Sequence, residues 1–225
     1  MDGQLQPERG WPTRDGVYLP GRLLDWLSLW VLGWFNRRVT RDEILQLFKD
    51  SGALLDGHFI LRSGLRSRQF FQCALAMQQM PSVERLGAAL AEKLRNYAPV
   101  TVLAPAMGGL VIGQEVARQL GVRFIFVEKE QGDLVLRRGF KIESGEKLVI
   151  VEDVVTKGGR VAETLIIARE HQAEVCAVGV VVDRSNGTVD VGVPMECLLP
   201  MEVEMFDPES LPEDLQNIPA TKPGS

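Results

Sequence analysis

Four runs of consecutive apolar residues, separated by helix-like stretches, constrain the fold of this 225-residue chain more than any other feature. The runs are VTVLA, VRFIFV, KLVIVE and VCAVGVVV, which begin at residues 100, 122, 147 and 175. Strands that are apolar on both faces are covered on both sides, as in the parallel sheets of α/β proteins. Because amphipathic stretches lie at 82–96, 107–121 and 160–172, the sequence predicts a parallel sheet with helices on both faces.

The segment before the first of these strands has its own local signals. Thr40 and Glu43 have the spacing of a capping box, which indicates a helix that ends near Gly52. HFILR and RQFFQ, with SGLRS between them, are typical of two strands joined by a turn. Further along, DLVLRRGF at 133–140 is expected to form a short hairpin within a polar segment, 128–146.

Residues 1–38 form a separate part, a loose arm followed by RLLDWLSLWVLGWFNRR. The apolar run in this stretch is about 13 residues long and therefore too short for a bilayer, which takes about 20. Trp26, Trp30 and Trp34 recur every four residues and are predicted to share one helix face. Two interpretations stay open: the helix packs on protein, either its own domain or a second subunit, or it lies in a membrane surface with neighbouring arginines at the lipid headgroups.

Composition sets further limits on the class of protein. The chain has 45% hydrophobic residues, which is ample for one domain, expected at 39–206, whereas the acidic, proline-rich tail at 207–225 is predicted to be disordered. A net charge of −5 without any basic block argues against a nucleic-acid partner. Three widely separated cysteines argue against disulfides or a zinc site, so we expect a cytoplasmic protein, with membrane association left open through the Trp-rich helix.

The loops PAMGG, DVVTKGG and DRSNG follow three of the expected strands and should therefore open on the same edge of the sheet. Gly158 and Gly159 allow a tight turn whose N–H groups, together with the start of a helix near Arg160, predict a cradle for a phosphate monoester. Glu152 and Asp153, just before it, suit the hydroxyls of a sugar and a hydrated Mg²⁺ nearby. The stretch predicts a sugar 5-phosphate site; the alternative is a plain strand–turn–helix with acids facing water.

VIVEDVVTKGG resembles the phosphoribosyl-diphosphate (PRPP) signature of the type I phosphoribosyltransferases. GHFILRSGLRSRQFFQ and LAPAMGGLVIGQEVARQLG are similar to the N-terminal and diphosphate-loop segments of the orotate-specific members of that family. The resemblance covers residues 41–206 and implies a Rossmann-like parallel sheet with a small hood. It also implies a homodimer that uses Mg²⁺ and makes orotidine 5′-phosphate and diphosphate from orotate and PRPP, a step of pyrimidine nucleotide biosynthesis.

The resemblance implies roles for individual residues. Glu152 and Asp153 would hold the ribose hydroxyls, with Asp153 also catalytic, and Mg²⁺ would arrive with PRPP and water rather than on direct protein ligands. Lys129 would be a second catalytic residue, on a mobile loop that closes over the diphosphate in a neighbouring subunit's site. Further PRPP contacts would come from Ala106, Met107, Gly108, Gly109, Thr156, Lys157, Gly158, Gly159 and Arg160. The orotate pocket would be lined by Arg62, Phe70, Phe71, Thr156 and Arg184.

The chain departs from the family pattern in this site. Lys157 stands where a second Thr is usual, Arg160 where Ser or Thr is usual, Arg62 where Lys is usual, and Gly108 where some relatives have Lys. Lys157 and Arg160 either strengthen phosphate attraction or fill the cradle with their own side chains. Arg137 and Arg138 are candidates to replace missing basic residues of the mobile loop.

Two functional interpretations therefore stay open. One is an active orotate phosphoribosyltransferase. The other is a catalytically weak or inactive homologue that serves as a binding or assembly module and docks through its Trp-rich helix on a membrane or a larger protein complex.

Overall fold

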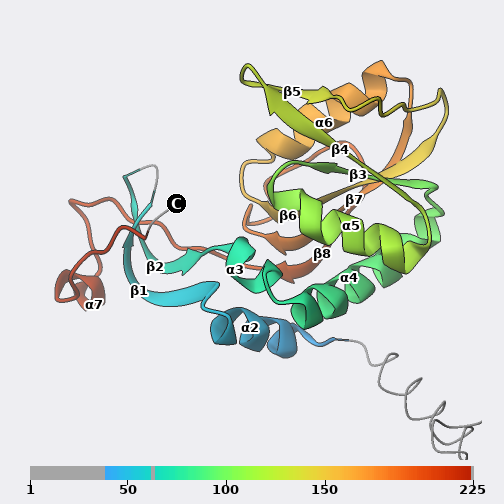
Figure 1. Cartoon of the computed structure of the whole chain (residues 1–225). Helices are drawn as coiled ribbons and strands as arrows, with labels where there is room; N and C mark the ends of the chain where they lie inside the picture. The colour runs from blue at the N-terminus through green and yellow to red at the C-terminus, as the bar shows by residue number, and fades with distance from the viewer. Residues whose placement is uncertain (1–38, 62–63, 224–225) are drawn as a thin grey trace, which may run out of the picture. The chain divides into compact units, whose positions relative to one another are not determined.

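The computed structural model describes residues 39–61 and 64–223 (Figure 1). The predicted Trp-rich helix, with Trp26, Trp30 and Trp34, lies outside the described residues and stays a prediction, as does the role of Arg62.

A six-stranded sheet with the strand order β5-β4-β3-β6-β7-β8 forms the centre of the described chain. All neighbouring strands pair in parallel except β5, which runs antiparallel to β4 at one edge. The predicted parallel sheet is thereby confirmed, although the edge strand β8 is not among the predicted strands. The strands are β3 (Thr101–Pro105), β4 (Arg123–Glu130), β5 (Asp133–Leu136), β6 (Lys147–Val155), β7 (Glu174–Asp183) and β8 (Met195–Pro200).

Helices cover both faces of this sheet, with α4 (Met80–Leu94) and α5 (Gly108–Leu120) on one face and α6 (Gly159–Glu170) on the other (Figure 1). A short 3-10 turn, η1 (Arg95–Tyr97), follows α4. Within residues 39–61 and 64–223, no helix combines the length and the apolar character needed to cross a membrane.

The side chains of β6 show why both faces are covered. Val149 and Val151 pack in the cluster that contains α4 and α5, whereas Leu148 and Ile150 pack in the cluster that contains α6. All four side chains are fully buried. Since neighbouring strand residues point to opposite faces, a run of consecutive apolar residues is required where a strand separates two cores.

A second, smaller sheet carries the predicted strand pair. β1 (Leu54–Ile60) and β2 (Arg66–Phe71) are antiparallel, and we call this ribbon the hood. It is preceded by α2 (Arg41–Asp50), whose capping box between Thr40 and Glu43 is formed as the sequence predicts. The hood is followed by α3 (Cys73–Met77), a single turn that the sequence did not indicate.

The C-terminal tail differs from the disordered segment that its composition predicts. It contains a helical turn, α7 (Glu213–Gln216), and the side chain of Leu215 is buried. Phe206 forms a bridge with Arg66 on one edge of the hood, and Thr221 forms one with Phe59 on the other edge. The expectation is corrected for a physical reason: the edges of a two-stranded ribbon offer unpaired backbone groups, which a polar segment satisfies without a large apolar content.

Candidate functional site

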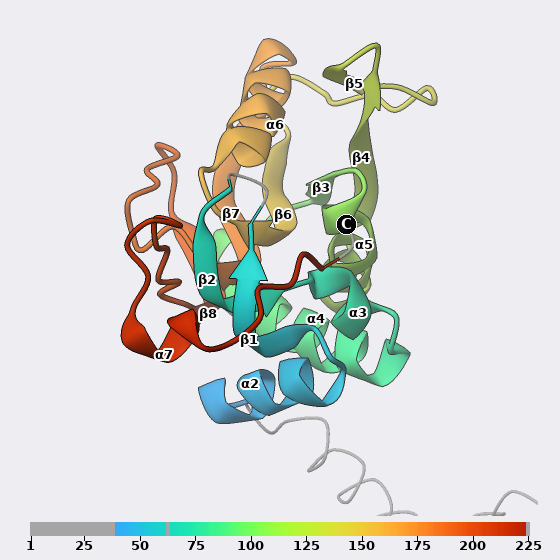
Figure 2. The ribbon, with the colours of Figure 1, turned by 90° about the vertical axis from the view of Figure 1, so that its left-hand side faces the viewer.

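The loops after β3, β6 and β7 lie together at one edge of the main sheet, as parallel topology requires. The backbone N–H of Ala106 donates to the carbonyl of Val127 at 2.7 Å, and that of Arg184 donates to the carbonyl of Val155 at 2.8 Å. Figure 2, which faces this edge, shows β1 and β2 in front of the ends of β6 and β7, and Figure 1 shows the hood beside that edge. The hood and the three loops therefore surround one region.

Glu152 and Asp153 lie within β6 and not after it, because the strand continues to Val155. The Glu152 side chain is only 5% exposed, and Asp153 is half-buried. Burial raises the pKa of both carboxyls, and the charge of Asp153 raises the pKa of Glu152 further. Two poorly solvated carboxylates side by side resist double ionisation, so the pair holds a proton to higher pH than a free carboxyl does.

Two neighbours define the surroundings of Asp153. A Cβ atom added to Gly108 would lie 2.6 Å from Oδ1 of Asp153, so the loop after β3 contacts the carboxylate closely. The buried thiol of Cys73, the first residue of α3, lies against the same carboxylate, and burial together with the charge of Asp153 raises its pKa. Nothing in the spacing of Cys73 suggested this position, since the contact depends on how α3 docks against β6.

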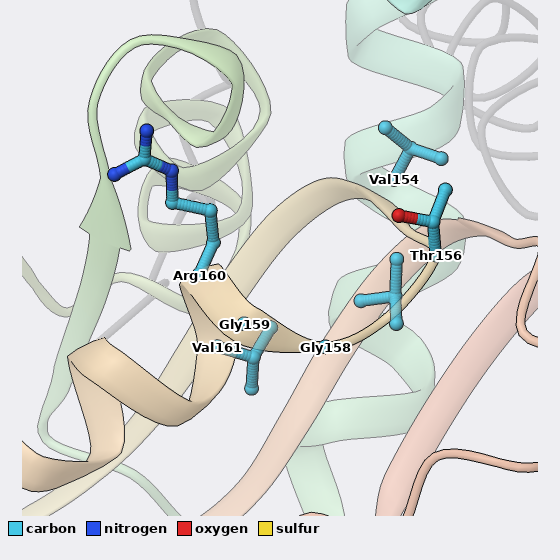
Figure 3. Close-up of a pocket in the computed structure, with 7 residues that line it drawn as sticks. Val154, Thr156, Gly158, Gly159, Arg160 and Val161 are labelled. Atoms are coloured by element: carbon cyan, nitrogen blue, oxygen red, sulfur yellow. The ribbon is translucent and has the colours of Figure 1, made fainter. Parts of the chain in front are cut away.

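A hollow of about 230 Å³, open to solvent, lies where β6 turns into α6 (Figure 3). Its lining consists of Val154, Val155, Thr156, Gly158, Gly159, Arg160 and Val161. Gly158 is the N-cap of α6 and has φ +74°, the left-handed region in which glycine is favoured. The N–H groups at the start of a helix have no partner within the helix and carry partial positive charge, so the hollow is suited to an anion.

Neither unusual cation fills this hollow. Figure 3 shows the side chain of Arg160 extending away from Thr156 and Gly158, and its Nη1 lies 3.4 Å from Oε2 of Glu163. Lys157 is exposed and does not belong to the lining. The side chains of Lys157 and Arg160 therefore do not block the phosphate cradle in this structure.

Lys129 and the two arginines after it belong to a hairpin. Lys129 is exposed on β4 and pairs with Leu134 of β5, so it lies on a strand and not on a loop. The expectation that residues 133–140 form a hairpin by themselves is corrected, because β5 is a single strand that pairs with β4. Arg137 and Arg138 are held by carboxylates of the same hairpin, at 3.0 Å from Glu130 and 2.8 Å from Glu128, respectively. Both ion pairs lie at the surface, and the suggestion that the two arginines replace missing basic residues stays a prediction.

The remaining predicted residues divide between the site and the core. Arg184 is half-buried, burial lowers its pKa, and its Nε has no hydrogen-bond partner among the described residues. Phe70 and Phe71 point to opposite faces of β2, because side chains alternate along a strand. Phe71 is buried 4.7 Å from the ring of Phe48, so the expectation that both phenylalanines line one pocket is corrected.

At the site, Glu152 and Asp153 are available as ligands for a metal ion, and the described residues form no larger group of metal ligands. Across residues 39–61 and 64–223, no three His, Cys, Asp or Glu side chains are grouped so that they could hold an ion. Glu152 and Asp153 are oxygen donors of the kind that Mg²⁺ prefers, but a Mg²⁺ ion usually has six oxygen ligands. They therefore fit an ion that brings most of its ligands with it.

The fold and the site define a class: α/β proteins of the Rossmann-like type, with a glycine turn for an anion and a carboxylate pair beside it. Residues 75–208 match the model of the phosphoribosyl transferase domain. The orotate phosphoribosyltransferases of Pelotomaculum thermopropionicum and Desulforamulus reducens are 49% and 46% identical to the chain over 187 residues, which is 83% of this chain and 98% of each relative. The chain belongs to the phosphoribosyltransferase family, and within it to the orotate phosphoribosyltransferases.

Solved structures agree with this assignment at the level of the fold. The orotate phosphoribosyltransferase of Aeropyrum pernix superposes with a TM-score of 0.59 at 22% identity, covering 69% of this chain and 92% of that chain. A phosphoribosyltransferase of Corynebacterium diphtheriae superposes with a TM-score of 0.60 at 25% identity, covering 71% of this chain and 95% of that chain.

Proposed function

We propose that the chain transfers the ribose 5-phosphate group of PRPP to a ring nitrogen of orotate, forming orotidine 5′-phosphate and releasing diphosphate. One observation carries this proposal: the buried carboxylate pair lies between the glycine loop at Gly108 and the anion hollow that begins at Val154. A sugar that carries a phosphate at one end and a diphosphate at the other matches these three features in order. The names of relatives 46–49% identical to the chain support orotate as the base.

The residues have distinct tasks in this proposal. The hollow binds the 5-phosphate through the N–H groups of residues 159–161 and the hydroxyl of Thr156. Glu152 and Asp153 accept hydrogen bonds from the ribose hydroxyls, and Asp153 stabilises the positive charge that develops at the anomeric carbon. The diphosphate lies against the loop from Ala106 to Gly109, at the N-terminus of α5.

Arg184 is the proposed anchor of the base. Its guanidinium is partly buried, and a carboxylate beside it would offset the cost of that burial. A planar fork of donors matches a planar carboxylate such as that of orotate. Phe70 of the hood and Arg62 in the loop of the hood are proposed to complete the pocket.

Mg²⁺ is proposed to enter with PRPP and water near Glu152 and Asp153, and when bound it neutralises charge on the departing diphosphate. The exposed Lys129 is proposed to add a further positive charge, from the hairpin of one subunit to the site of the other subunit of a homodimer. The position of the hairpin supports a positive charge at this edge, because the C-terminal end of β4 lies at the same sheet edge as the loops of the site. The second subunit rests on what the family resemblance implies.

A direct assay tests the function. Purified protein is mixed with PRPP, Mg²⁺ and orotate, and the absorbance of orotate is followed. We expect this absorbance to fall with time and to stay constant when PRPP is omitted. When uracil, which lacks the carboxylate, replaces orotate, the absorbance of uracil should stay constant as well. A constant absorbance in the complete mixture, with the protein folded by circular dichroism, contradicts the proposal.

Lys157→Thr is expected to raise KM for PRPP by a few-fold at low salt and to leave kcat unchanged. The lysine is exposed near the hollow, and its attraction for phosphate is long-range and screened by ions, so the effect should fade above about 0.5 M salt. The measurement is KM at several salt concentrations. Lys147→Thr, at the opposite end of β6, is the control, and an equal change in both variants contradicts a role of Lys157 at the site.

Gly108→Ala is expected to lower activity, whereas Gly109→Ala is expected to lower stability. A Cβ at Gly108 meets the mobile end of the Asp153 side chain, so the carboxylate shifts and kcat/KM falls while stability changes little. A Cβ at Gly109 would lie 2.7 Å from the backbone carbonyl of Val151, so the backbone must move at a cost of about 1–3 kcal/mol in the free energy of unfolding. Steady-state kinetics and denaturant unfolding are measured for both variants. Full activity of Gly108→Ala contradicts the close contact between Gly108 and the Asp153 carboxylate.

A further inference from the structure

We propose that residues 204–221 form a clamp that holds the hood in place over the site, and that Arg68 is the positioning residue that fastens it. This inference rests on the proposed function only where it concerns the base. Its structural part concerns β1, β2 and the tail alone.

The hood needs support because a ribbon of two strands is marginally stable by itself. The clamp pairs with both of its outer edges (Figure 2). On the β2 edge, Arg66 and Phe206 exchange two backbone hydrogen bonds of 2.8 and 2.9 Å. On the β1 edge, Thr221 accepts from the N–H of Ile60 at 2.8 Å and donates its own N–H to the carbonyl of His58 at 2.9 Å. The ribbon thereby gains a paired segment on each side.

Arg68 makes the densest set of contacts between the hood and the clamp. Its Nε and Nη2 donate to the two carboxylate oxygens of Asp214 at 2.8 and 2.9 Å, and its Nη1 donates to Glu204. The guanidinium also stacks over the ring of Phe206, 4.7 Å from its centroid. Since side chains alternate along β2, Arg68 lies on the same face as Phe70, the hood residue proposed to line the base pocket.

A second anchor lies on the other strand of the hood. The buried side chain of His58 on β1 hydrogen-bonds through Nδ1 to the carbonyl of Ile218 at 2.8 Å, and the buried Leu215 precedes it in the clamp. A bidentate arginine pair fixes orientation as well as distance, whereas a single hydrogen bond to a carbonyl fixes mainly distance. Arg68 therefore adds a side-chain contact that fixes orientation to the backbone pairing on the two edges.

The arrangement leads to a selective effect on the two substrates. The base pocket is proposed to draw on the hood, whereas the phosphate hollow and the carboxylate pair belong to β6 and α6 of the main sheet. A loosened hood should therefore weaken the binding of orotate while the binding of PRPP stays as it is. General loss of stability affects both substrates alike, so the split between the two is diagnostic.

The kinetic test uses Arg68→Gln, Asp214→Asn and the double variant. We expect KM for orotate to rise roughly 10-fold in each single variant, because small misplacements of a binding group have large effects. The double variant should be no worse than Arg68→Gln alone, since Arg68→Gln already removes the pair that Asp214→Asn breaks. Arg118→Gln is the matched control: Arg118 also binds two carboxylates, Glu115 of α5 and Glu84 of α4, and neither belongs to the hood or the clamp.

Calorimetric titration with PRPP and hydrogen exchange complete the test. PRPP affinity should be unchanged in the Arg68 and Asp214 variants, and backbone amides of residues 54–60 and 66–71 should exchange faster than in the wild type, while those of α6 do not. Unchanged exchange in the hood, or an equal rise of KM for both substrates, overturns the clamp. If the wild type itself does not consume orotate, the proposed function fails, whereas the exchange experiment still decides the clamp.

Discussion

Asp153→Asn is expected to lower kcat/KM by about 10²-fold or more without unfolding the protein. The substitution keeps the shape of the side chain but removes its negative charge. In a largely buried site, that charge is worth far more than in water, both to the ribose hydroxyls and to the positive charge that develops on the sugar. Steady-state kinetics with varied PRPP measure the loss, and Asp50→Asn on the exposed surface of α2 is the control. Wild-type turnover in Asp153→Asn contradicts the role of the pair.

The same pair makes stability depend on pH in a predictable direction. The folded-state pKa of Glu152 is raised, so the native protein binds more protons than the unfolded chain over the range above the ordinary carboxyl pKa. The free energy of unfolding therefore falls as the pH rises through this range. Glu152→Gln cannot ionise, so it should flatten the dependence and be more stable than the wild type at pH 8. Denaturant unfolding at pH 5 and pH 8 measures this, and a variant less stable at pH 8 contradicts it.

Proton release on binding follows from the same argument. When PRPP and Mg²⁺ occupy the site, both carboxylates are needed in the charged form, so the shared proton must leave. Calorimetry of PRPP binding in two buffers with different ionisation enthalpies should therefore show proton release by the wild type near pH 7 and less by Glu152→Gln. If Glu152→Gln is inactive, yet is more stable than the wild type at pH 8 and releases fewer protons on binding, its activity was not lost through unfolding.

The parallel sheet was predictable because its signals are local. A strand buried on both faces needs consecutive apolar residues, as in LVIV of β6, and the capping box at Thr40 and Glu43 lies within four residues. The edge strand β8 is half-buried for most of its length and lacks such a run. The tail was missed for a related reason, since its order depends on the edges of a ribbon some 140 residues earlier, which Phe206 and Thr221 complete.

Topology predicted the backbone of the site better than its side chains. Parallel strands place their ends at one edge, so the meeting of the Gly108 loop with Asp153 follows from the strand pattern. The direction of Arg160 depends on its pairing with Glu163, and the position of Cys73 depends on the docking of a single helical turn. The spacing of Arg160 and Glu163, three residues apart in one helix, permits their pairing, but no spacing places Cys73 against Asp153.

Gly158→Ala is expected to have the second large effect, a rise of at least 10-fold in KM for PRPP together with lower stability. Two separate causes act at this position. The backbone has φ +74°, which costs a residue with a side chain about 1–2 kcal/mol. A Cβ would also lie 2.7 Å from Cγ1 of Val189, so either the turn or the neighbouring loop must move. Since the turn directs the N–H groups that form the hollow, its displacement weakens phosphate binding.

The two causes are separable with matched variants. Gly121→Ala, at the C-terminus of α5, has a similar backbone conformation (φ +72°), and no atom of the described part of the chain lies within 4 Å of the added Cβ, so it should show the backbone cost alone and normal kinetics. Val189→Ala removes the methyl groups that the new Cβ meets, so adding it to Gly158→Ala should recover most of the PRPP affinity but leave the backbone cost in place. If Val189→Ala gives no recovery, the steric account of the turn is wrong. If Gly158→Ala binds PRPP as the wild type does, the hollow at the start of α6 is not where the phosphate binds.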